Sequence, residues 1–215
     1  MSKSHLAPLQ SIVAFGDSIT RGYGLNPGEG WVELMSESLK KTNGTSISVF
    51  NAGGNGNTSA EGLSRIETDV LAHMPGVALV EFGGNDTVHD TRAVTVDEFE
   101  RNLLAIHEKV VNKGGEIVFL TFPPVVNEWH STHSDPYYNP WNGIDQCVEQ
   151  YRHRTRELAK RLNAPLFDLD ELLREKIFGK EKETYVSRDG VHLTAFANKL
   201  IAESVLKFLR NIEKL

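Results

Sequence analysis

The stretch SIVAFGDSIT (residues 11–20) runs from small apolar residues directly into the polar sequence Gly-Asp-Ser. Its first five residues form a nearly continuous apolar run with β-branched and aromatic side chains. Such a run is typical of a strand that is buried on both faces, as the strands of parallel sheets are. Ser18 follows this predicted strand, where it either caps a short helix beginning near Ile19 or acts as a nucleophile.

Strand-like and helix-like segments alternate along the rest of the chain. Four more apolar runs of the same kind predict strands at 47–52, 77–82, 116–122 and 164–169. Alternation of this kind predicts an α/β protein, with about five parallel strands in one sheet and helices on both of its faces. No repeat, linker or low-complexity segment divides the sequence, so we expect a single domain over residues 1–215.

Helix signals lie between the predicted strands. Capping boxes begin at Thr58 and Thr95, each with a glutamate three residues later, and Gly114 occupies the left-handed position that ends a helix. Apolar side chains at helical spacing predict helices after these boxes and in two later segments. They are Leu63, Ile66 and Val70; Phe99, Leu103, Ile106 and Val110; Ile144, Val148, Tyr151, Leu158 and Leu162; and Phe196, Leu200, Ile201, Val205 and Leu209.

Composition and charge limit the class of protein. The chain has 215 residues, of which 40% are hydrophobic and 24% charged, which suits a soluble globular protein. Its one cysteine, Cys147, excludes an intrachain disulfide, fits a reducing compartment and is expected to be a small packed residue. The net charge of −6 argues against a nucleic-acid partner. The nearest approach to a basic stripe is interpreted as a solvated helix surface, formed by Arg152, Arg154, Arg156, Lys160 and Arg161.

The N-terminal sequence MSKSHLAPLQS contains no apolar stretch of signal-peptide length. No apolar run approaches the roughly 18 residues that a membrane-spanning helix needs. We therefore expect a cytoplasmic protein without a membrane span.

Three polar loops are predicted to meet at one edge of the sheet. Ser18 follows the first strand, NAGGNGNTS (51–59) follows the second, and GGND (83–86) follows the third. The carboxyl ends of parallel strands lie at the same edge, and ligands bind there.

A candidate base for Ser18 lies near the end of the chain, in the sequence SRDGVHLT. A serine hydroxyl is a poor nucleophile until a base takes its proton, and histidine is the usual base. Asp189 and His192 are three residues apart, so the aspartate is able to hold the imidazole ring in the required tautomer. The alternative is a turn aspartate with a histidine near a helix cap.

Attack on an ester also creates an oxyanion, which needs hydrogen-bond donors aimed at it. The candidates are the backbone amides of Ser18 and Gly56 and the side-chain amide of Asn85. Glycine lets a backbone N–H approach a substrate without a Cβ, and asparagine donates without a charge. The alternatives are a flexible turn at Gly56 and a turn residue at Asn85.

The sequences FGDSIT, NAGGNGNTS, VEFGGND and DGVH, in this order, resemble the four blocks of the SGNH subgroup of GDSL-type hydrolases. The resemblance spans nearly the whole chain. It implies a three-layer, flavodoxin-like α/β/α sandwich and ester hydrolysis without a metal or other cofactor. In the second block the chain departs from the usual pattern, because Gly54 and Asn55 occupy places that usually hold a hydrophobic or small residue and a serine.

The resemblance also implies the roles of the site residues. Ser18 is expected to be the nucleophile, His192 the base and Asp189 its orienting partner, with Ser18, Gly56 and Asn85 as oxyanion donors. Asp17 and Asp86 lie inside the motifs, and we interpret them as supporting residues that hold the loops through backbone amides.

The expected function is a metal-independent serine hydrolase that cleaves carboxylic esters through an acyl-enzyme. Its substrate is expected to be a small carbohydrate or lipid ester, with a short acyl chain such as acetyl. The alternative within the family is a lysophospholipase or thioesterase.

A long segment, residues 123–143, follows the fourth predicted strand and should lie over the same edge. We expect it to form one wall of the substrate pocket through Trp129, Tyr137, Tyr138 and Trp141, unless these aromatics only pack the loop onto the body. Its motif His130-x-x-His133-x-Asp135 lacks an evident fourth ligand, so we predict no metal site.

Three functions of other classes are weighed against the esterase. A metal-dependent phosphoesterase would need an Asp-x-His pair that the first strand lacks. A nucleotide-binding module is disfavoured because Ser59 replaces the third glycine of the fingerprint and no Walker lysine follows. A catalytically inactive binding protein on the same fold is disfavoured by the intact Ser18, Asp189 and His192.

Overall fold

Five strands form one parallel sheet in the computed structural model, which describes residues 9–43, 47–179 and 181–215. The strand order is β2-β1-β3-β4-β5, and every neighbouring pair is parallel. The predicted α/β class and the five-stranded parallel sheet are therefore confirmed. The strands are β1 (Ser11–Gly16), β2 (Ser48–Gly53), β3 (Val77–Glu81), β4 (Glu116–Leu120) and β5 (Leu166–Phe167).

The strand predictions differ from the structure mainly at the ends. The strand expected over 164–169 is reduced to the two residues of β5, because Asp168 already caps the following helix and accepts a hydrogen bond from the amide of Glu171. The run at 116–122 stops pairing two residues early, where the long segment that follows leaves the sheet.

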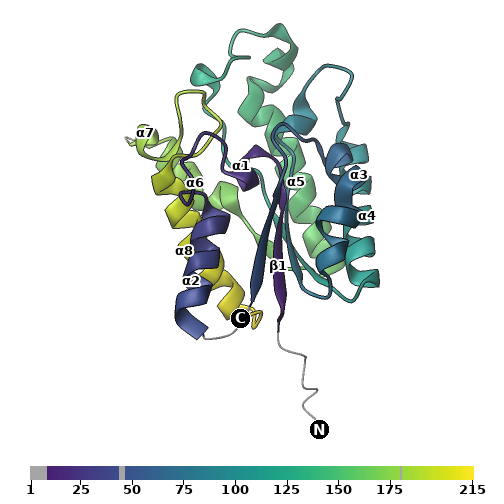
Figure 1. The fold of residues 1–215 in the computed structure, drawn as a ribbon. Helices are drawn as coiled ribbons and strands as arrows, with labels where there is room; N and C mark the ends of the chain where they lie inside the picture. Colours follow the sequence, from purple (N-terminus) through teal and green to yellow (C-terminus); the bar gives the residue numbers. More distant parts are fainter. Residues whose placement is uncertain (1–8, 44–46, 180) are drawn as a thin grey trace.

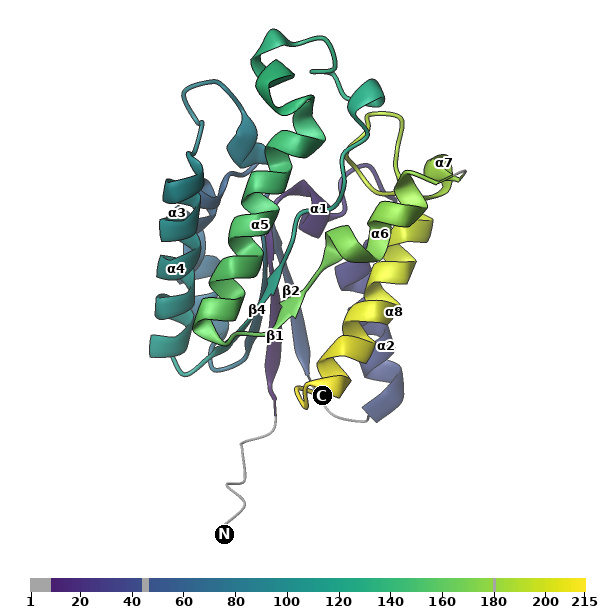
Figure 2. The same ribbon diagram turned by 180° about the vertical axis from the view of Figure 1, so that it is seen from behind.

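Helices cover both faces of the sheet, which gives the three layers (Figures 1 and 2). One face carries α2, α6 and α8, and the other carries α3, α4 and α5. The helices are α1 (Ser18–Arg21), α2 (Trp31–Asn43), α3 (Ser59–Asp69), α4 (Val96–Asn112), α5 (Ile144–Leu162), α6 (Leu169–Ile177), α7 (Lys182–Tyr185) and α8 (Ala195–Asn211).

Side-chain alternation along β1 explains why the sheet needs both layers. Ile12 and Ala14 pack in the core beneath α2 and α8, whereas Val13 and Phe15 pack in the core beneath α3 and α4. All four side chains are fully buried. Successive residues of a strand point to opposite faces, so a continuous apolar run supplies side chains to the cores on both faces of the sheet.

The predicted helix signals are confirmed in detail. Thr58 and Thr95 both form reciprocal capping boxes with the glutamates three residues later, and they begin α3 and α4. Gly114 has the left-handed φ of 74° after the end of α4. In α8, Phe196 differs from the rest of its predicted stripe, because it is largely exposed and packs edge-on against Tyr185.

Three helices are absent from the predictions, namely α2, α6 and α7. The signal for α2 is present in the chain, because Trp31, Met35 and Leu39 recur at four-residue intervals and all three are buried. The sequence between Gly22 and Gly30 is rich in glycine and polar residues, which hides the beginning of this helix.

The interpretation of the basic residues of α5 as a solvated surface is wrong for Arg152. Its side chain is completely buried, and Arg156 is more than half buried. A charged side chain is rarely buried unless it is paired, so the buried Arg152 is expected to take part in an internal network of ion pairs.

The remaining predictions concern the N-terminal segment, membrane-spanning helices and Cys147. Residues 1–8, on which the absence of a leader was judged, lie outside the described residues. None of the helices in the described part of the chain combines the length and apolar character needed to cross a membrane. Cys147 is a buried, free thiol in the core, as predicted.

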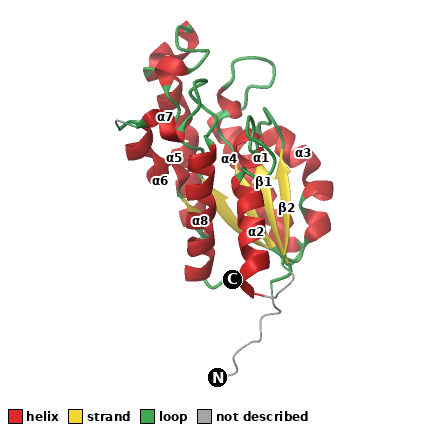
Figure 3. Ribbon diagram, turned by 60° about the vertical axis from the view of Figure 1, so that its left-hand side comes forward, coloured by secondary structure: helices red, strands yellow, loops and turns green. Residues whose placement is uncertain are grey.

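The loops that follow the strands gather at one end of the sheet, opposite the end where β1 begins and α8 ends (Figures 1 and 3). The register places Gly16 at the end of β1 beside Gly53 at the end of β2, and the amide of Gly54 donates to the carbonyl of Gly16 at 2.9 Å. Because β3 is the other neighbour of β1, the three polar motifs begin on adjacent strands.

Candidate active site

Ser18 is the first residue of the short helix α1, directly after β1. The N-cap of this helix is Asp17, whose carboxylate accepts a hydrogen bond from the amide of Ile19 at 2.9 Å. The capping role considered for Ser18 therefore belongs to its neighbour. The Ser18 side chain is left to contact a residue from the other end of the chain.

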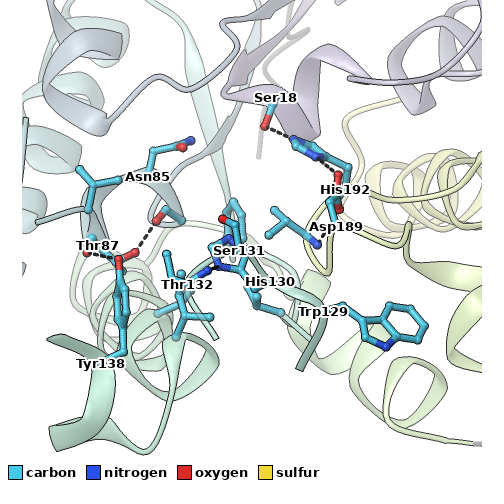
Figure 4. A pocket seen from close by; sticks show the side chains of 17 residues that line it. Ser18, Asn85, Thr87, Trp129, His130, Ser131, Thr132, Tyr138, Asp189 and His192 are labelled. Carbon is cyan, nitrogen blue, oxygen red and sulfur yellow. Dashed lines mark hydrogen bonds and ion pairs between the residues drawn. The ribbon is translucent and has the colours of Figure 1, made fainter. Parts of the chain in front are cut away.

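His192 connects Ser18 to Asp189 (Figure 4). Its Nε2 atom lies 2.9 Å from Ser18 Oγ, and its Nδ1 atom lies 2.7 Å from Asp189 Oδ2. An ionised carboxylate only accepts hydrogen bonds, so Nδ1 donates to Asp189 and Nε2 is left to accept from the serine hydroxyl. This is the arrangement that general-base activation of a serine requires.

Asp189 is held in its ionised form by its hydrogen bonds. Its Oδ1 atom accepts from the amides of Val191 and His192, each at 2.9 Å. Partial burial by itself would raise the pKa of Asp189, but these amides and the His192 ring lower it below its ordinary value. The carboxylate is therefore charged at neutral pH and fixes the tautomer of the imidazole.

Tyr23, which the sequence analysis did not single out, contacts the candidate base. Its ring centroid lies 4.4 Å from that of His192, with the two planes inclined by 39°. The tyrosine is about half exposed and lies beside the imidazole.

Asn85 joins the three loops. It belongs to the 3₁₀ turn η2 (Asn85–Thr87) after β3, and its Nδ2 atom donates to Asp17 Oδ2 at 2.9 Å and to the Asn57 carbonyl at 3.2 Å. Figure 4 shows its side chain extending toward the side of the cavity where Ser18 lies. The amide is therefore oriented by the residue that precedes Ser18 and by the residue that follows Gly56.

The two backbone amides proposed as donors are free. The N–H groups of Ser18 and Gly56 have no acceptor among the described residues. Gly56 has a φ of 72°, a conformation that favours glycine, and there is open space where a Cβ would stand. Gly56 itself does not line the cavity that contains Ser18. Its link to the site is the next residue, Asn57, whose carbonyl accepts a hydrogen bond from Asn85.

Asp86 anchors the start of α3. The carboxylate accepts from the amide of Ser59 at 3.0 Å and from its hydroxyl group at 2.5 Å. Burial raises the pKa of Asp86 to about 6. Asp86 thus links the turn that carries Asn85 to the helix that follows the second loop.

A further carboxyl group, Glu81, lies beneath the site and was missed by the sequence analysis. It ends β3, is fully buried, and accepts from Thr20 Oγ1 at 3.0 Å and from the Asp17 amide at 3.5 Å. Its Oε1 atom is buried without a hydrogen-bond partner among the described residues. The available signal was a glutamate in the middle of the apolar run VALVEF.

Burial makes Glu81 and Asp17 weak acids. It is the main reason that the pKa of Asp17 rises to about 7, and burial together with the Asp17 carboxylate raises the pKa of Glu81 well above its ordinary value. The raised pKa favours the protonated form of Glu81, which costs less to bury than an ionised oxygen without a donor. Gly16 is required here, since a Cβ would lie 2.3 Å from Thr20 Oγ1.

A cavity of about 450 Å³ opens beside Ser18 and His192. One part of its wall is apolar and the other is polar, and residues of the long loop contribute to the polar part (Figure 4). The apolar lining includes Phe122, Val125, Ile144 and Val148, and the polar lining includes Thr87, His130, Ser131 and Thr132.

The long loop contributes two of the four predicted aromatic residues to this cavity, Trp129 and Tyr138. The expectation is corrected for Tyr137 and Trp141, which do not line it. Their rings contact each other at 5.6 Å, and Tyr137 stacks on His89 at 4.4 Å. Even Trp129 stands at the rim, where Lys182 and Arg188 lie over its ring.

The metal-site motif of the loop is not assembled. His130 Nδ1 bonds to Thr132, and Asp135 pairs with His89 at 2.9 Å. Among residues 9–43, 47–179 and 181–215, no group of three or more His, Cys, Asp or Glu side chains is arranged to hold a metal ion.

The buried Arg152 holds the beginning of the loop. Its guanidinium donates to the carbonyls of Phe122 at 2.9 Å and Pro123 at 2.8 Å, and it pairs with Asp145 at 2.7 Å. Asp145 in turn accepts from the amide of Val125. The apolar wall of the cavity thus rests on an ion pair that sequence reasoning placed at the surface.

Gly190 joins the loop to the Asp189–His192 turn. Its carbonyl accepts from the amide of Val126 at 2.8 Å, and its φ is 80°. A Cβ at this position would lie 2.6 Å from the Val126 carbonyl oxygen and 2.9 Å from the His130 nitrogen. The glycine therefore allows the cavity wall and the candidate base to be packed against each other.

Comparison with known proteins identifies a family for this architecture. The family model described as GDSL-like Lipase/Acylhydrolase family matches residues 14–200. This range includes all the residues of the site described above.

Individual relatives are distant but cover most of the chain. The uncharacterized lipoprotein YqeF of Bacillus subtilis is 26% identical, over 91% of this chain and 88% of its own. The thioesterase 1/protease 1/lysophospholipase L1 of Escherichia coli is also 26% identical, over 95% of this chain and 85% of its own. A solved structure, the acetyl xylan esterase AlAXEase, is 25% identical with a TM-score of 0.72 and covers 93% of this chain and 99% of its own.

Proposed function

This chain belongs to the GDSL-like lipase/acylhydrolase family and is an ester hydrolase, and we propose that it cleaves short-acyl esters through an acyl-enzyme on Ser18. One observation carries the proposal. His192 bridges Ser18 Oγ and Asp189 Oδ2 at 2.9 and 2.7 Å, at the mouth of a cavity of about 450 Å³. A cavity of this size is typical of small-molecule sites.

The proposed reaction has two steps. His192 Nε2 takes the proton of Ser18 as the serine oxygen bonds to the ester carbonyl carbon, and the imidazolium then gives that proton to the departing alcohol. Water next loses a proton to His192 and attacks the acyl-serine, which releases the acid and returns the proton to Ser18. Asp189, whose carboxylate stays ionised, stabilises the imidazolium in both steps.

The amides of Ser18 and Gly56 and the side chain of Asn85 are the proposed oxyanion donors. The two backbone N–H groups have no internal acceptor among the described residues, so they are free to bind the developing charge. Asn85 has its longer hydrogen bond, 3.2 Å, to the Asn57 carbonyl. An oxyanion would replace this acceptor, while the 2.9 Å bond to Asp17 keeps the amide oriented.

A short acyl group is favoured by the mixed character of the cavity, which has Thr87, His130 and Thr132 in its wall beside the apolar residues. The name of the solved acetyl xylan esterase agrees with this choice. The alternative is a thioesterase or lysophospholipase, as one relative is named, with its acyl chain along Phe122 and Ile144. The lone buried thiol of Cys147 supports a cytoplasmic location, although another relative is named a lipoprotein.

Turnover of 4-nitrophenyl esters from acetyl to dodecanoyl, with a metal chelator present, tests the function. We expect kcat/KM to be highest for acetyl or butyryl and at least about tenfold lower for dodecanoyl, because long chains overfill the cavity. Highest turnover of the dodecanoyl ester would indicate the lysophospholipase alternative. Loss of turnover in chelator would favour a metal-dependent enzyme, and failure of a serine-directed phosphonate to label the protein would favour an inactive binding protein.

Substitution of Asn85 by alanine tests the proposed oxyanion donors. We expect kcat to fall by about a hundredfold or more, because one aimed donor is lost from the transition state. Asn102→Ala is the matched control, since its amide donates to Ser59 Oγ at 2.9 Å and does not line the cavity. The assignment fails if the two variants, with equal thermal midpoints, turn over the acetyl ester at similar rates.

A further inference from the structure

We propose that His130 selects the alcohol part of the ester, by donating a hydrogen bond from Nε2 to an oxygen of a hydroxylated leaving group such as a sugar. The inference rests on the proposed function, because it assigns the substrate class of the same site. It concerns the alcohol part of the ester and is independent of the length of the acyl chain.

His130 is attached to the turn that carries the candidate base. It follows the 3₁₀ turn η3 (Asn127–Trp129), and its amide donates to the carbonyl of Val126 at 3.1 Å. Val126 donates to Gly190, which lies between Asp189 and His192. The His130 ring lines the same cavity as His192 and Ser18, and Figure 4 shows it among the side chains around that cavity.

The hydrogen bonds of His130 determine its tautomer. The amide of Thr132 donates to Nδ1 at 3.2 Å, so Nδ1 is an acceptor and the hydrogen of the neutral ring is on Nε2. Burial and the nearby His192 lower the pKa of His130, and Asp189 only partly offsets them. The ring is therefore neutral at pH 7 and presents an uncharged N–H donor.

This donor is not used within the protein. Nε2 of His130 forms no hydrogen bond among the described residues. In these residues only Glu81 Oε1 and His107 Nδ1 are side-chain atoms that are both buried and without a partner, so the unpaired Nε2 is not buried. Nε2 is therefore accessible. The hydroxyl of Ser131, next in the chain and also lining the cavity, likewise has no partner in the described part of the structure.

Two other polar residues of the cavity wall already have internal partners. Thr87 Oγ1 donates to the Gly84 carbonyl at 2.7 Å, and the Tyr138 hydroxyl donates to the Thr87 carbonyl at 3.2 Å. In the polar part of the wall, free hydrogen-bonding capacity therefore lies at His130 and Ser131, apart from the proposed oxyanion donors. This distribution separates a polar part of the cavity from an apolar part.

The chemistry of the base decides which part of the substrate meets the polar side. His192 must protonate the leaving oxygen, so the alcohol is held beside the turn that carries His192. A hydrocarbon alcohol would bury the His130 donor without an acceptor, at a cost in binding. An alcohol with further hydroxyl groups provides the acceptor, which points to an acylated carbohydrate.

The test compares two acetyl esters that differ only in the alcohol, 4-nitrophenyl acetate and a mono-acetylated methyl xyloside with free neighbouring hydroxyls. His130→Phe keeps an aromatic ring and removes the donor, and His130→Gln restores an N–H. We expect His130→Phe to lower kcat/KM for the xyloside about tenfold, mainly through KM, and to change that for nitrophenyl acetate less than about threefold. His130→Gln should recover most of the loss.

His133→Phe is the matched control, because it is an exposed histidine of the same loop that does not line the cavity. Equal losses on both esters would assign His130 a structural role and overturn the inference, as would no loss on either. Wild-type turnover of nitrophenyl acetate without turnover of the xyloside would also overturn it while leaving the proposed function intact. Failure of the wild-type protein on both esters would instead reject the proposed function.

Discussion

Ser18→Ala is expected to lower kcat for acetyl ester hydrolysis by roughly ten-thousandfold or more, with little change in the fold. The hydroxyl oxygen is the proposed nucleophile, and its hydrogen-bond partner is His192 Nε2. Alanine leaves that base with nothing to activate except water. The helix that begins at Ser18 should persist, because its cap is the carboxylate of Asp17.

Steady-state turnover and covalent labelling measure this effect together. The wild-type protein should show a burst of nitrophenol and take up one equivalent of a serine-directed phosphonate, and the variant should do neither. Ser64→Ala is a matched control, since its exposed hydroxyl bonds only to the Glu61 carbonyl on the surface of α3. A Ser18→Ala protein that keeps more than about a tenth of the activity would exclude Ser18 as the nucleophile.

Arg152→Met is expected to have the largest effect on stability, a loss of about 3–5 kcal/mol in the free energy of unfolding. The methionine fills much of the space but leaves the carbonyls of Phe122 and Pro123 buried without their donor. Asp145 loses its 2.7 Å ion pair and retains the amide of Val125, at 2.9 Å, and the charge of Arg174, at 3.0 Å. Each buried polar group that loses its partner contributes to the cost.

Urea denaturation measures the difference against Arg161→Met. Arg161 lies on the same helix and pairs with Glu100, but its side chain is 54% exposed, so its loss should cost less than about 1 kcal/mol. Since Arg152 supports the wall of the cavity, its variant should also show a raised KM for the acetyl ester under conditions where it is folded. Similar stability losses in the two variants would mean that the buried network contributes no more than a surface pair.

The fold was largely predictable because local patterns and tertiary packing agree. Continuous apolar runs mark strands buried on both faces, and the capping boxes at Thr58 and Thr95 begin α3 and α4. The shortened β5 was not predictable in this way, because the side chain of Asp168 ends the strand by capping α6. Helix α2 was missed although Trp31, Met35 and Leu39 carry its spacing.

The candidate site was predictable where residue type and spacing carry chemistry. Serine after the first strand and Asp-x-x-His before the last helix are unusual enough in combination to be identified 174 residues apart. Tyr23 and His130 carry no such signal, and Glu81 is marked only as a charged residue within an apolar run. Each acquires its proposed or observed role from a neighbour distant in the chain, such as His192 for Tyr23 and Thr20 for Glu81.

Local sequence patterns were enough to predict the order of the strands along the chain, the class of the fold and the edge at which the motifs meet. They were enough because the carboxyl ends of parallel strands must lie together, whatever the details of packing. Three other features became visible only in the folded chain: Asp17 caps α1 in place of Ser18, Arg152 is buried beneath the loop, and His130 lines the cavity while Tyr137 does not. Burial and hydrogen-bond partners depend on contacts between distant segments, and no local pattern of residues encodes those contacts.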